Sequence, residues 1–258
     1  MEYSAKGLRV VVTAGAAGIG RVITRTFAEH GAKLHICDVD EKALSKFGKE
    51  VPAVTQTVAD VSRVGDVDRL FEDAKRNLGG LDVLINNAGI AGPTARVEDI
   101  RPEDWERCIA VDLNGMFYCT RKAMPLIKAA GGGSIINLSS IAGRLGFAMR
   151  TPYAAAKWAV VGFTQSLAVE AGPHKVRVNC IQPGVVEGER VERIVAAKAE
   201  QLGVPPGEVL ARMVEGVSLK TMVSAQDIAN MALFLACDAG RHISGQAISV
   251  CGGARYMV

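Results

Sequence analysis

The chain has 258 residues, of which 49% are hydrophobic, and this length and content are enough to bury one large core. We therefore expect a single domain covering residues 1–258. The formal net charge is +3, and the Lys and Arg residues are scattered without a basic stripe. This pattern argues against nucleic acid as a partner.

The six cysteines stand far apart, with no CxxC pair and no His at a zinc-ligand spacing. They predict free thiols rather than disulfides or a metal site. The first residues lack a charged segment followed by a long apolar stretch, and no apolar run reaches ~18 residues. We expect a soluble, cytoplasmic protein with no metal and no membrane partner.

Continuous apolar or β-branched runs predict strands at 8–13, 33–38, 53–60, 81–86, 133–140, 176–181 and 246–250. Strands that are apolar on both faces are typical of a buried parallel sheet, and the intervals between them mostly carry a helical period. The predicted fold class is α/β: a doubly wound, seven-stranded, mostly parallel sheet with helices on both faces.

Three long helices are predicted at 19–30, 102–130 and 153–171, because each ends at glycine or Gly-Pro. Ser224 and Asp227 resemble a capping box at the start of a further helix. The pattern between about 184 and 221 is less regular and rich in Gly and Pro. We expect this segment to lie over the strand ends as a substrate lid.

The first predicted strand leads into the glycine-rich stretch "TAGAAGIG" at 13–20 and then into a helix. Backbone N–H groups at such a turn can hold a pyrophosphate, although a turn that only packs the helix against the sheet is the alternative. Asp38 ends the second strand, where a carboxylate accepts hydrogen bonds from ribose hydroxyls and repels a 2′-phosphate. This indicates NAD(H) rather than NADP(H), unless Asp38 is a surface-loop residue.

Tyr153 and Lys157 lie four positions apart, so they share one helix face and can point toward one site. A phenol is a poor acid or base near neutrality, and a nearby ammonium stabilises its ionised form. Ser140 ends the strand before this helix, where its hydroxyl could hydrogen-bond a substrate oxygen. A Tyr-x3-Lys pair alone usually marks two surface residues; its setting here favours catalysis.

Together these motifs resemble the short-chain dehydrogenases/reductases, a family of single-domain, Rossmann-type nicotinamide-dependent oxidoreductases. The resemblance spans essentially the whole chain. Thr13, Gly18 and Gly20 match the family's TGxxxGxG, with Ala14 in place of its first glycine. The cofactor-binding residues that the resemblance implies are Gly18, Ile19, Gly20, Asp38, Asp60, Val61, Asn87, Tyr153, Lys157 and Val186.

One of these residues has an alternative role, and another lies close to a departure from the family pattern. Asn87 belongs to the NNAG loop at 86–89, which could equally be a turn that stabilises the sheet. Val186 follows the Pro183-Gly184 turn, which the family places beneath the nicotinamide. Family members usually have Thr where this chain has Gly188, so one hydrogen bond to the cofactor is expected to be missing.

The resemblance also implies catalytic roles. Tyr153 would be the general acid/base, Lys157 would tune it and hold the ribose hydroxyls, and Ser140 would bind the substrate oxygen. The family often adds an Asn in a VNLxG segment that relays the proton through water. Here the segment reads "VDLNG", which puts Asp112 in that place.

The sequence carries less information about the substrate. Arg144 and Arg150 lie between Ser140 and Tyr153, and Arg190 opens the presumed lid. A guanidinium near the reacting centre suits an anionic or polar substrate, most plausibly through Arg150 or Arg190. Solvated surface arginines are the alternative.

We therefore expect an NAD-dependent oxidoreductase acting on a small alcohol or carbonyl compound, such as a sugar, polyol, hydroxy acid or secondary alcohol. A 3-oxoacyl-carrier-protein reductase is a second hypothesis, which Asp38 disfavours because that activity usually uses NADPH. A dinucleotide sensor without turnover is a third. The family resemblance also suggests a homo-tetramer, with the helices at 102–130 and 153–171 in the interfaces.

Overall fold

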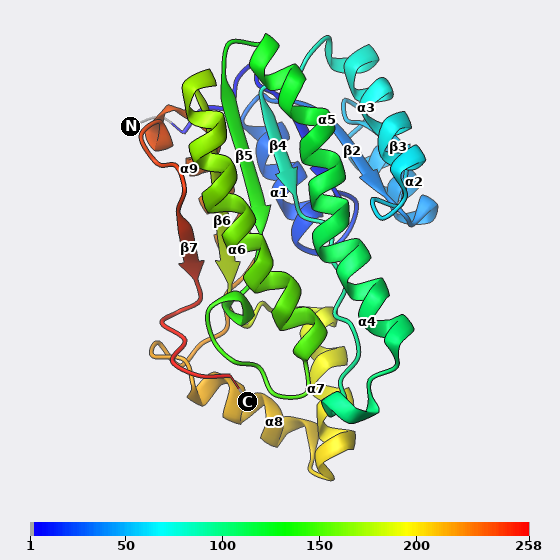
Figure 1. Cartoon of the computed structure of the whole chain (residues 1–258), viewed down its shortest axis with the longest axis vertical. Coiled ribbons are helices and arrows are strands. Elements are labelled where there is room, and N and C mark those ends of the chain that lie inside the picture. The colour runs from blue at the N-terminus through cyan, green and yellow to red at the C-terminus, as the bar shows by residue number, and fades with distance from the viewer. Residues whose placement is uncertain (1–2, 258) are drawn as a thin grey trace.

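The computed structural model describes residues 3–257, and it has one central sheet with helices on both sides (Figure 1). The strands follow the order β3-β2-β1-β4-β5-β6-β7, and every neighbouring pair is parallel. The seven strands are β1 (Arg9–Thr13), β2 (Lys33–Asp38), β3 (Thr55–Val58), β4 (Val83–Asn86), β5 (Gly133–Leu138), β6 (Val176–Pro183) and β7 (Ala247–Val250). The predicted doubly wound sheet is therefore confirmed, and it is entirely rather than mostly parallel.

The helices occupy the intervals between the strands. They are α1 (Gly18–Glu29), α2 (Glu41–Glu50), α3 (Val64–Leu78), α4 (Pro102–Ile109), α5 (Gly115–Ala129), α6 (Thr151–Ala171), α7 (Glu189–Leu202), α8 (Pro206–Glu215) and α9 (Ala225–Ala236). The predicted capping box precedes α9, since Ser224 and Asp227 bond each other's backbone N–H groups. Helix α6 begins two residues before the predicted start, with Pro152 in its first turn, where the missing N–H costs nothing.

The predicted long helix at 102–130 is interrupted in its middle. Between α4 and α5 the backbone makes one turn of π-helix over Ala110–Asn114. Such a turn inserts extra backbone into a continuous helix, so the side chains on either side of it change register. Apolar periodicity does not reveal this change, and Asp112 lies within the turn.

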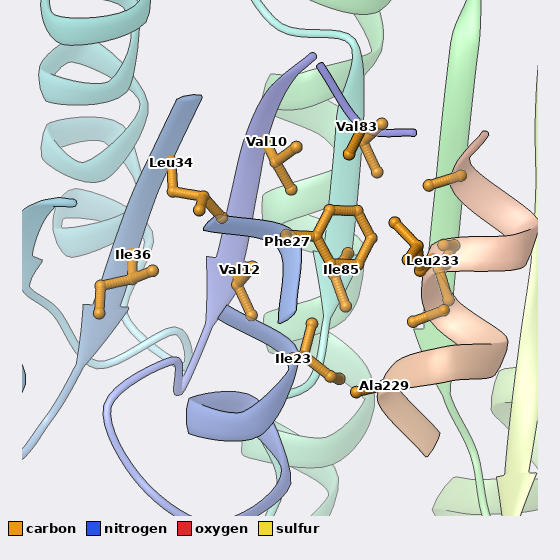
Figure 2. Packing of buried hydrophobic residues seen from close by; sticks show 14 of the residues in the cluster. Val10, Val12, Ile23, Phe27, Leu34, Ile36, Val83, Ile85, Ala229 and Leu233 are labelled. Atoms are coloured by element: carbon orange, nitrogen blue, oxygen red, sulfur yellow. The ribbon is translucent and has the colours of Figure 1, made fainter. Parts of the chain in front are cut away.

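Successive residues of β1 point to opposite faces of the sheet and contribute to two cores. Val10 and Val12 pack with Ile23 and Phe27 of α1 and with residues of α9 (Figure 2). Val11 instead joins the cluster with α3 and α5 on the other face. Each buried Val, Ile or Phe side chain contributes about 1.5–3 kcal/mol to folding, so both helix layers hold the strands in place.

Helices α7 and α8 lie beyond the carboxyl ends of the strands and share a small apolar cluster that includes Val195 and Met213 (Figure 1). The chain that follows α8 is tied to the C-terminal segment by main-chain bonds, from Ser218 N to Gly253 O and from Leu219 N to Gly252 O, both 3.0 Å. The segment predicted as a lid is thus a helix pair with its own core. Its role as a substrate lid stays a prediction.

Candidate active site

The glycine-rich turn joins β1 to α1 at the carboxyl edge of the sheet. The residue before α1, Ala17, provides no side-chain cap, so the first N–H groups of this 12-residue helix stay free to bind an anion. A Cβ on Gly20 would lie 2.0 Å from the Ala14 carbonyl oxygen and 2.5 Å from Asn87 Nδ2. Only glycine fits there, whereas a side chain at Gly18 would point into open space. This cradle fits the pyrophosphate of a dinucleotide.

Asp38 lies at the end of β2, beside this turn. Its side chain accepts hydrogen bonds from Ala16 N at 3.3 Å and from Asp40 N at 3.2 Å, so the carboxylate also holds the turn in place. Arg21, a basic residue near the turn, is paired with Glu50. The end of β2 thus presents a carboxylate, a group suited to ribose hydroxyls and opposed to a 2′-phosphate. The alternative of a surface-loop Asp is wrong, because Asp38 is a buried strand residue.

Asn87 connects the loop after β4 to the turn after β1. Its Nδ2 donates to the carbonyl oxygens of Thr13 and Ala14, both at 3.0 Å, and its backbone N–H donates to Thr13 Oγ1 at 3.0 Å. The structural alternative for this loop is therefore correct. A contact between Asn87 and the cofactor ribose stays a prediction.

Asp60, Val61 and Val186 lie in the loops at the same edge of the sheet. The Asp60 carboxylate accepts hydrogen bonds from Ser62 Oγ at 2.7 Å and Arg107 Nη2 at 3.0 Å, which hold the loop after β3 against α4. Val61 is buried in the core beneath it. Val186 forms a bridge with Val223. Their contacts with an adenine or a nicotinamide stay predictions.

Gly188 precedes α7 with φ +122°, a conformation that is strained for any residue with a Cβ. Gly188, which stands where family members usually have Thr, therefore adopts a conformation that a Thr would adopt only with strain.

Tyr153 and Lys157 emerge from one face of α6, with Lys157 Nζ 5.5 Å from the centre of the Tyr153 ring. Lys157 is 4% exposed, and its Nζ donates to the Leu138 carbonyl oxygen at 3.1 Å. Ser140, two residues beyond β5, is also buried. Its Oγ accepts from Ala142 N at 3.1 Å, which leaves the hydroxyl hydrogen to be donated elsewhere. The structure therefore places Lys157 beside the phenol, with its ammonium bonded to the end of β5.

Asp112 lies directly behind Lys157. One carboxylate oxygen accepts from Ile90 N at 2.7 Å, and the other lies 3.3 Å from Lys157 Nζ in an ion pair that is almost fully buried. The carboxylate therefore fixes both the lysine and the loop after β4. Its predicted role in orienting a water stays untested, whereas its role as the partner of Lys157 is observed.

Two of the three arginines considered from the sequence contact Tyr153. The Cζ atoms of Arg150 and Arg190 lie 5.2 Å and 5.7 Å from its ring centre, and Arg190 also donates to the Gly89 carbonyl oxygen. Arg144 instead donates to Ala254 O in the C-terminal segment. Arg150 is fully buried and Arg190 is exposed, so the surface alternative is wrong for Arg150.

Sequence reasoning missed Lys198, a candidate residue on α7. It is 2% exposed, and burial together with the charge of Arg150 lowers its pKa to about 8. Its position among Val191, Val195 and Ala199, which form the buried stripe of α7, was the available signal: a lysine within the apolar face of a helix. Among residues 3–257, no helix is long and apolar enough to cross a membrane, and no group of three His, Cys, Asp or Glu residues could hold a metal ion.

Comparison with known proteins places the chain among dehydrogenases. A family model described as Enoyl-(Acyl carrier protein) reductase matches residues 14–255. Momilactone A synthase of Oryza sativa subsp. japonica is 38% identical over 96% of this chain and 89% of its own length. Galactitol 2-dehydrogenase of Agrobacterium fabrum is 36% identical over 94% of this chain and 95% of its own.

A solved structure titled NAD+-bound xylitol dehydrogenase superposes with a TM-score of 0.93 at 26% identity, covering 96% of this chain and 99% of that one. These matches extend over nearly the whole chain, and the Ser140, Tyr153 and Lys157 arrangement lies within them. The chain belongs to the short-chain dehydrogenase/reductase family.

Proposed function

We propose that this protein is an NAD(H)-dependent oxidoreductase that transfers a hydride between the nicotinamide and a small alcohol or carbonyl compound, such as a sugar, polyol, hydroxy acid or secondary alcohol. The observation that carries the proposal is the placement of Tyr153 beside a buried Lys157, whose ammonium is held by Leu138 O and Asp112. Relatives named as galactitol and NAD+-bound xylitol dehydrogenases support this reaction and this cofactor.

The cofactor would be held along the carboxyl edge of the sheet. The free N–H groups at the start of α1 suit its pyrophosphate, and the Asp38 carboxylate suits its adenosine ribose. When bound, the nicotinamide supplies the hydride acceptor or donor. The remaining contacts in this proposal come from Gly18, Ile19, Gly20, Asp60, Val61, Asn87, Tyr153, Lys157 and Val186.

The side chains at the end of β5 and on α6 would handle the proton. In alcohol oxidation, ionised Tyr153 takes the proton from the substrate hydroxyl while Ser140 donates a hydrogen bond to the same oxygen. Lys157 stabilises the ionised phenol through its positive charge. Asp112 keeps Lys157 in place, and Arg150 and Arg190 contact the substrate.

We also propose a homo-tetramer. Its support is an exposed apolar surface on α5 and α6, where Phe117 and Trp158 are 46% and 51% exposed and Val169 is 80% exposed. A groove between the two helices, lined in part by Met124, Phe163 and Leu167, continues this surface. A cytoplasmic location is part of the same proposal, supported by six free, buried cysteines.

The test is an absorbance assay for NADH formation with a panel of sugars, polyols, hydroxy acids and secondary alcohols, run with NAD and with NADP. Turnover should require NAD, and Tyr153→Phe should lower kcat by about 10²–10⁴-fold because the proton carrier is lost. NADH binding by the same variant, followed by fluorescence, should be retained.

Two results would favour a different function. Tight NADH binding without turnover of any compound class would favour a sensor. Consumption of NADPH alone, with acyl or ketone substrates, would favour the carrier-protein reductase. Asp38→Ala should raise kcat/KM for NADP relative to NAD, and an unchanged ratio would show that Asp38 does not select the cofactor.

A further inference from the structure

Arg150 is a fully buried guanidinium whose donors are mostly unused. Its Nη2 donates to the Ala91 carbonyl oxygen, while Nε and Nη1 have no hydrogen-bond partner among residues 3–257. Burying charged donors without partners is costly, and proteins generally avoid it unless the group serves another purpose. Arg150 therefore has donors available beside Tyr153, the residue proposed to take the substrate proton.

A second buried cation reaches the same place from α7. Lys198 Nζ lies 4.7 Å from the centre of the Phe147 ring, and Arg150 Cζ lies 5.2 Å from the same ring centre. The Lys198 ammonium donates to the Ala148 carbonyl oxygen at 3.3 Å, a neutral acceptor that leaves its charge uncompensated. Phe147 thus brings together one cation from the segment before α6 and one from α7.

The charges around Tyr153 do not balance. Within the part of the chain that the structure describes, the Asp112 carboxylate pairs with Lys157, and neither Arg150, Arg190 nor Lys198 forms an ion pair with an acidic side chain. Oxidised nicotinamide would add a further positive charge to this region. A negatively charged group is the partner that these cations lack.

We propose that the substrate carries an oxyanion, a carboxylate or a phosphate, that binds between Arg150 and Lys198 and places the reacting hydroxyl at Tyr153. This inference rests on the proposed function and specifies its substrate class. Because Lys198 belongs to α7, the helix pair α7–α8 completes the binding site. Arg190, bonded to Gly89 O at the start of the same helix, brings a further positive charge to Tyr153.

A purely structural role for Lys198 makes different predictions. If the lysine only fastens α7 through Ala148 O, Lys198→Met would lower Tm and would impair charged and neutral ligands alike. If it binds an anion, removing an uncompensated buried cation would leave Tm unchanged or raise it, while anion binding alone would be lost. Arg193→Met is the matched control, because Arg193 is exposed on the same helix.

The deciding experiment measures anion binding without turnover. Tm of the protein saturated with NADH, which fills the cofactor phosphate site, is titrated with sodium acetate and with sodium phosphate against sodium chloride of equal ionic strength. We expect a saturable rise in Tm with one of the two oxyanions, at least tenfold weaker apparent affinity in Lys198→Met, and no change in Arg193→Met. A response to acetate identifies a carboxylate substrate, and a response to phosphate identifies a phosphorylated one. Lys198→Gln repeats the test with a smaller change in the packing of α7.

The inference is overturned if neither oxyanion raises Tm more than chloride does, or if Lys198→Met shows the same rise in Tm as the wild type.

A second experiment compares turnover of D-glucitol, D-gluconate and D-glucitol 6-phosphate, which share one carbon skeleton and differ in charge. A selective rise in KM for the charged compound in Lys198→Met, with kcat retained, supports the site. Equal losses for charged and neutral compounds oppose it. Turnover of neutral alcohols without anion binding would reject this inference alone, whereas anion binding without turnover of any alcohol would reject the proposed function.

Discussion

Ala14 holds an uncommon backbone conformation at the entrance of the glycine-rich turn. Its φ is +49°, in the left-handed region, where a side chain with a Cβ costs roughly 1–2 kcal/mol relative to glycine. The conformation is kept because the Ala14 carbonyl oxygen accepts from Asn87 Nδ2 and lies directly against Gly20. The turn therefore has the shape that glycine would favour, although the residue is alanine.

We expect Ala14→Gly to raise the free energy of unfolding by up to about 1 kcal/mol, because relief of the strain exceeds the added entropy of the unfolded chain. Urea denaturation followed by circular dichroism measures the change. Ala196→Gly, at an exposed position in the middle of α7, should instead lose up to about 1 kcal/mol. Destabilisation by Ala14→Gly would show that Ala14 is not strained.

At the scale of elements, the π-helical turn between α4 and α5 places Asp112 beside Lys157. The carboxylate reaches both Ile90 N and Lys157 Nζ from this turn. Because the helix changes register at this turn, α5 can pack against the core while Asp112 reaches Lys157. π-helical turns often lie at functional sites for this reason.

Asp112→Leu should destabilise the protein by about 3–5 kcal/mol, because it leaves the ammonium of Lys157 buried without its counter-charge. Asp112→Asn should cost less, since its amide oxygen can still accept from Ile90 N. In urea denaturation, the double variant Asp112→Leu with Lys157→Met should recover part of the loss. Additive losses in the double variant would argue against coupling between the two side chains.

The edge formed by β2 and β3 contains a buried histidine. His35 is 0% exposed, and its ring nitrogens contact Thr55 Oγ1 at 2.8 Å and Thr57 Oγ1 at 3.0 Å. Burial lowers its pKa from 6.5 to about 4, and the Asp73 charge opposes this only in part. The folded protein therefore holds His35 neutral where the unfolded chain would protonate it.

Between pH 6.5 and about 4, the unfolded state binds more protons than the folded state. The free energy of unfolding should therefore fall as the pH falls through this window, and above pH 6.5 His35 should not affect its pH dependence. The loss is on the order of 3 kcal/mol. Unfolding free energies measured from pH 7 to pH 4 should show a flatter profile for His35→Gln. The exposed His174→Gln should keep the wild-type slope, and an equal slope in all three proteins would contradict the assignment.

At the scale of the whole molecule, the parallel sheet gathers segments that are distant in the chain. The turn after β1, the loop after β4, the end of β5, the start of α6 and α7 all lie at the carboxyl edge, where β1 and β4 are neighbours. In doubly wound sheets this reversal of strand order is where ligands bind. Helices α5 and α6 leave their apolar outer surface exposed on another side.

We expect Phe117→Glu to lower the molar mass measured by light scattering from that of a tetramer to that of a smaller species, since a charge within an apolar interface is costly. Leu202→Glu is the control, because Leu202 is 44% exposed at the end of α7, which is not part of this surface. If Phe117→Glu keeps the wild-type mass, the interface lies elsewhere.

Much of the fold was predictable because it depends on local patterns. The apolar runs located all seven strands, and the terminating glycines marked the ends of the long helices. The β3 prediction was too long, since only Thr55–Val58 pair, and short edge strands depend on the neighbouring strand for their length.

The amino-acid sequence by itself determined the α/β class, the glycine turn, Asp38 at the end of β2 and the shared face of Tyr153 and Lys157, since each follows from residue type and short-range spacing. Only the tertiary structure decided that Asp112 pairs with Lys157 and that Asn87 holds the turn after β1. It also decided that Arg150 and Lys198 lie buried beside the Phe147 ring. The physical reason is that burial and charge pairing depend on which distant segments the folded sheet brings together. Hydrophobic periodicity reports only which face of each element is apolar.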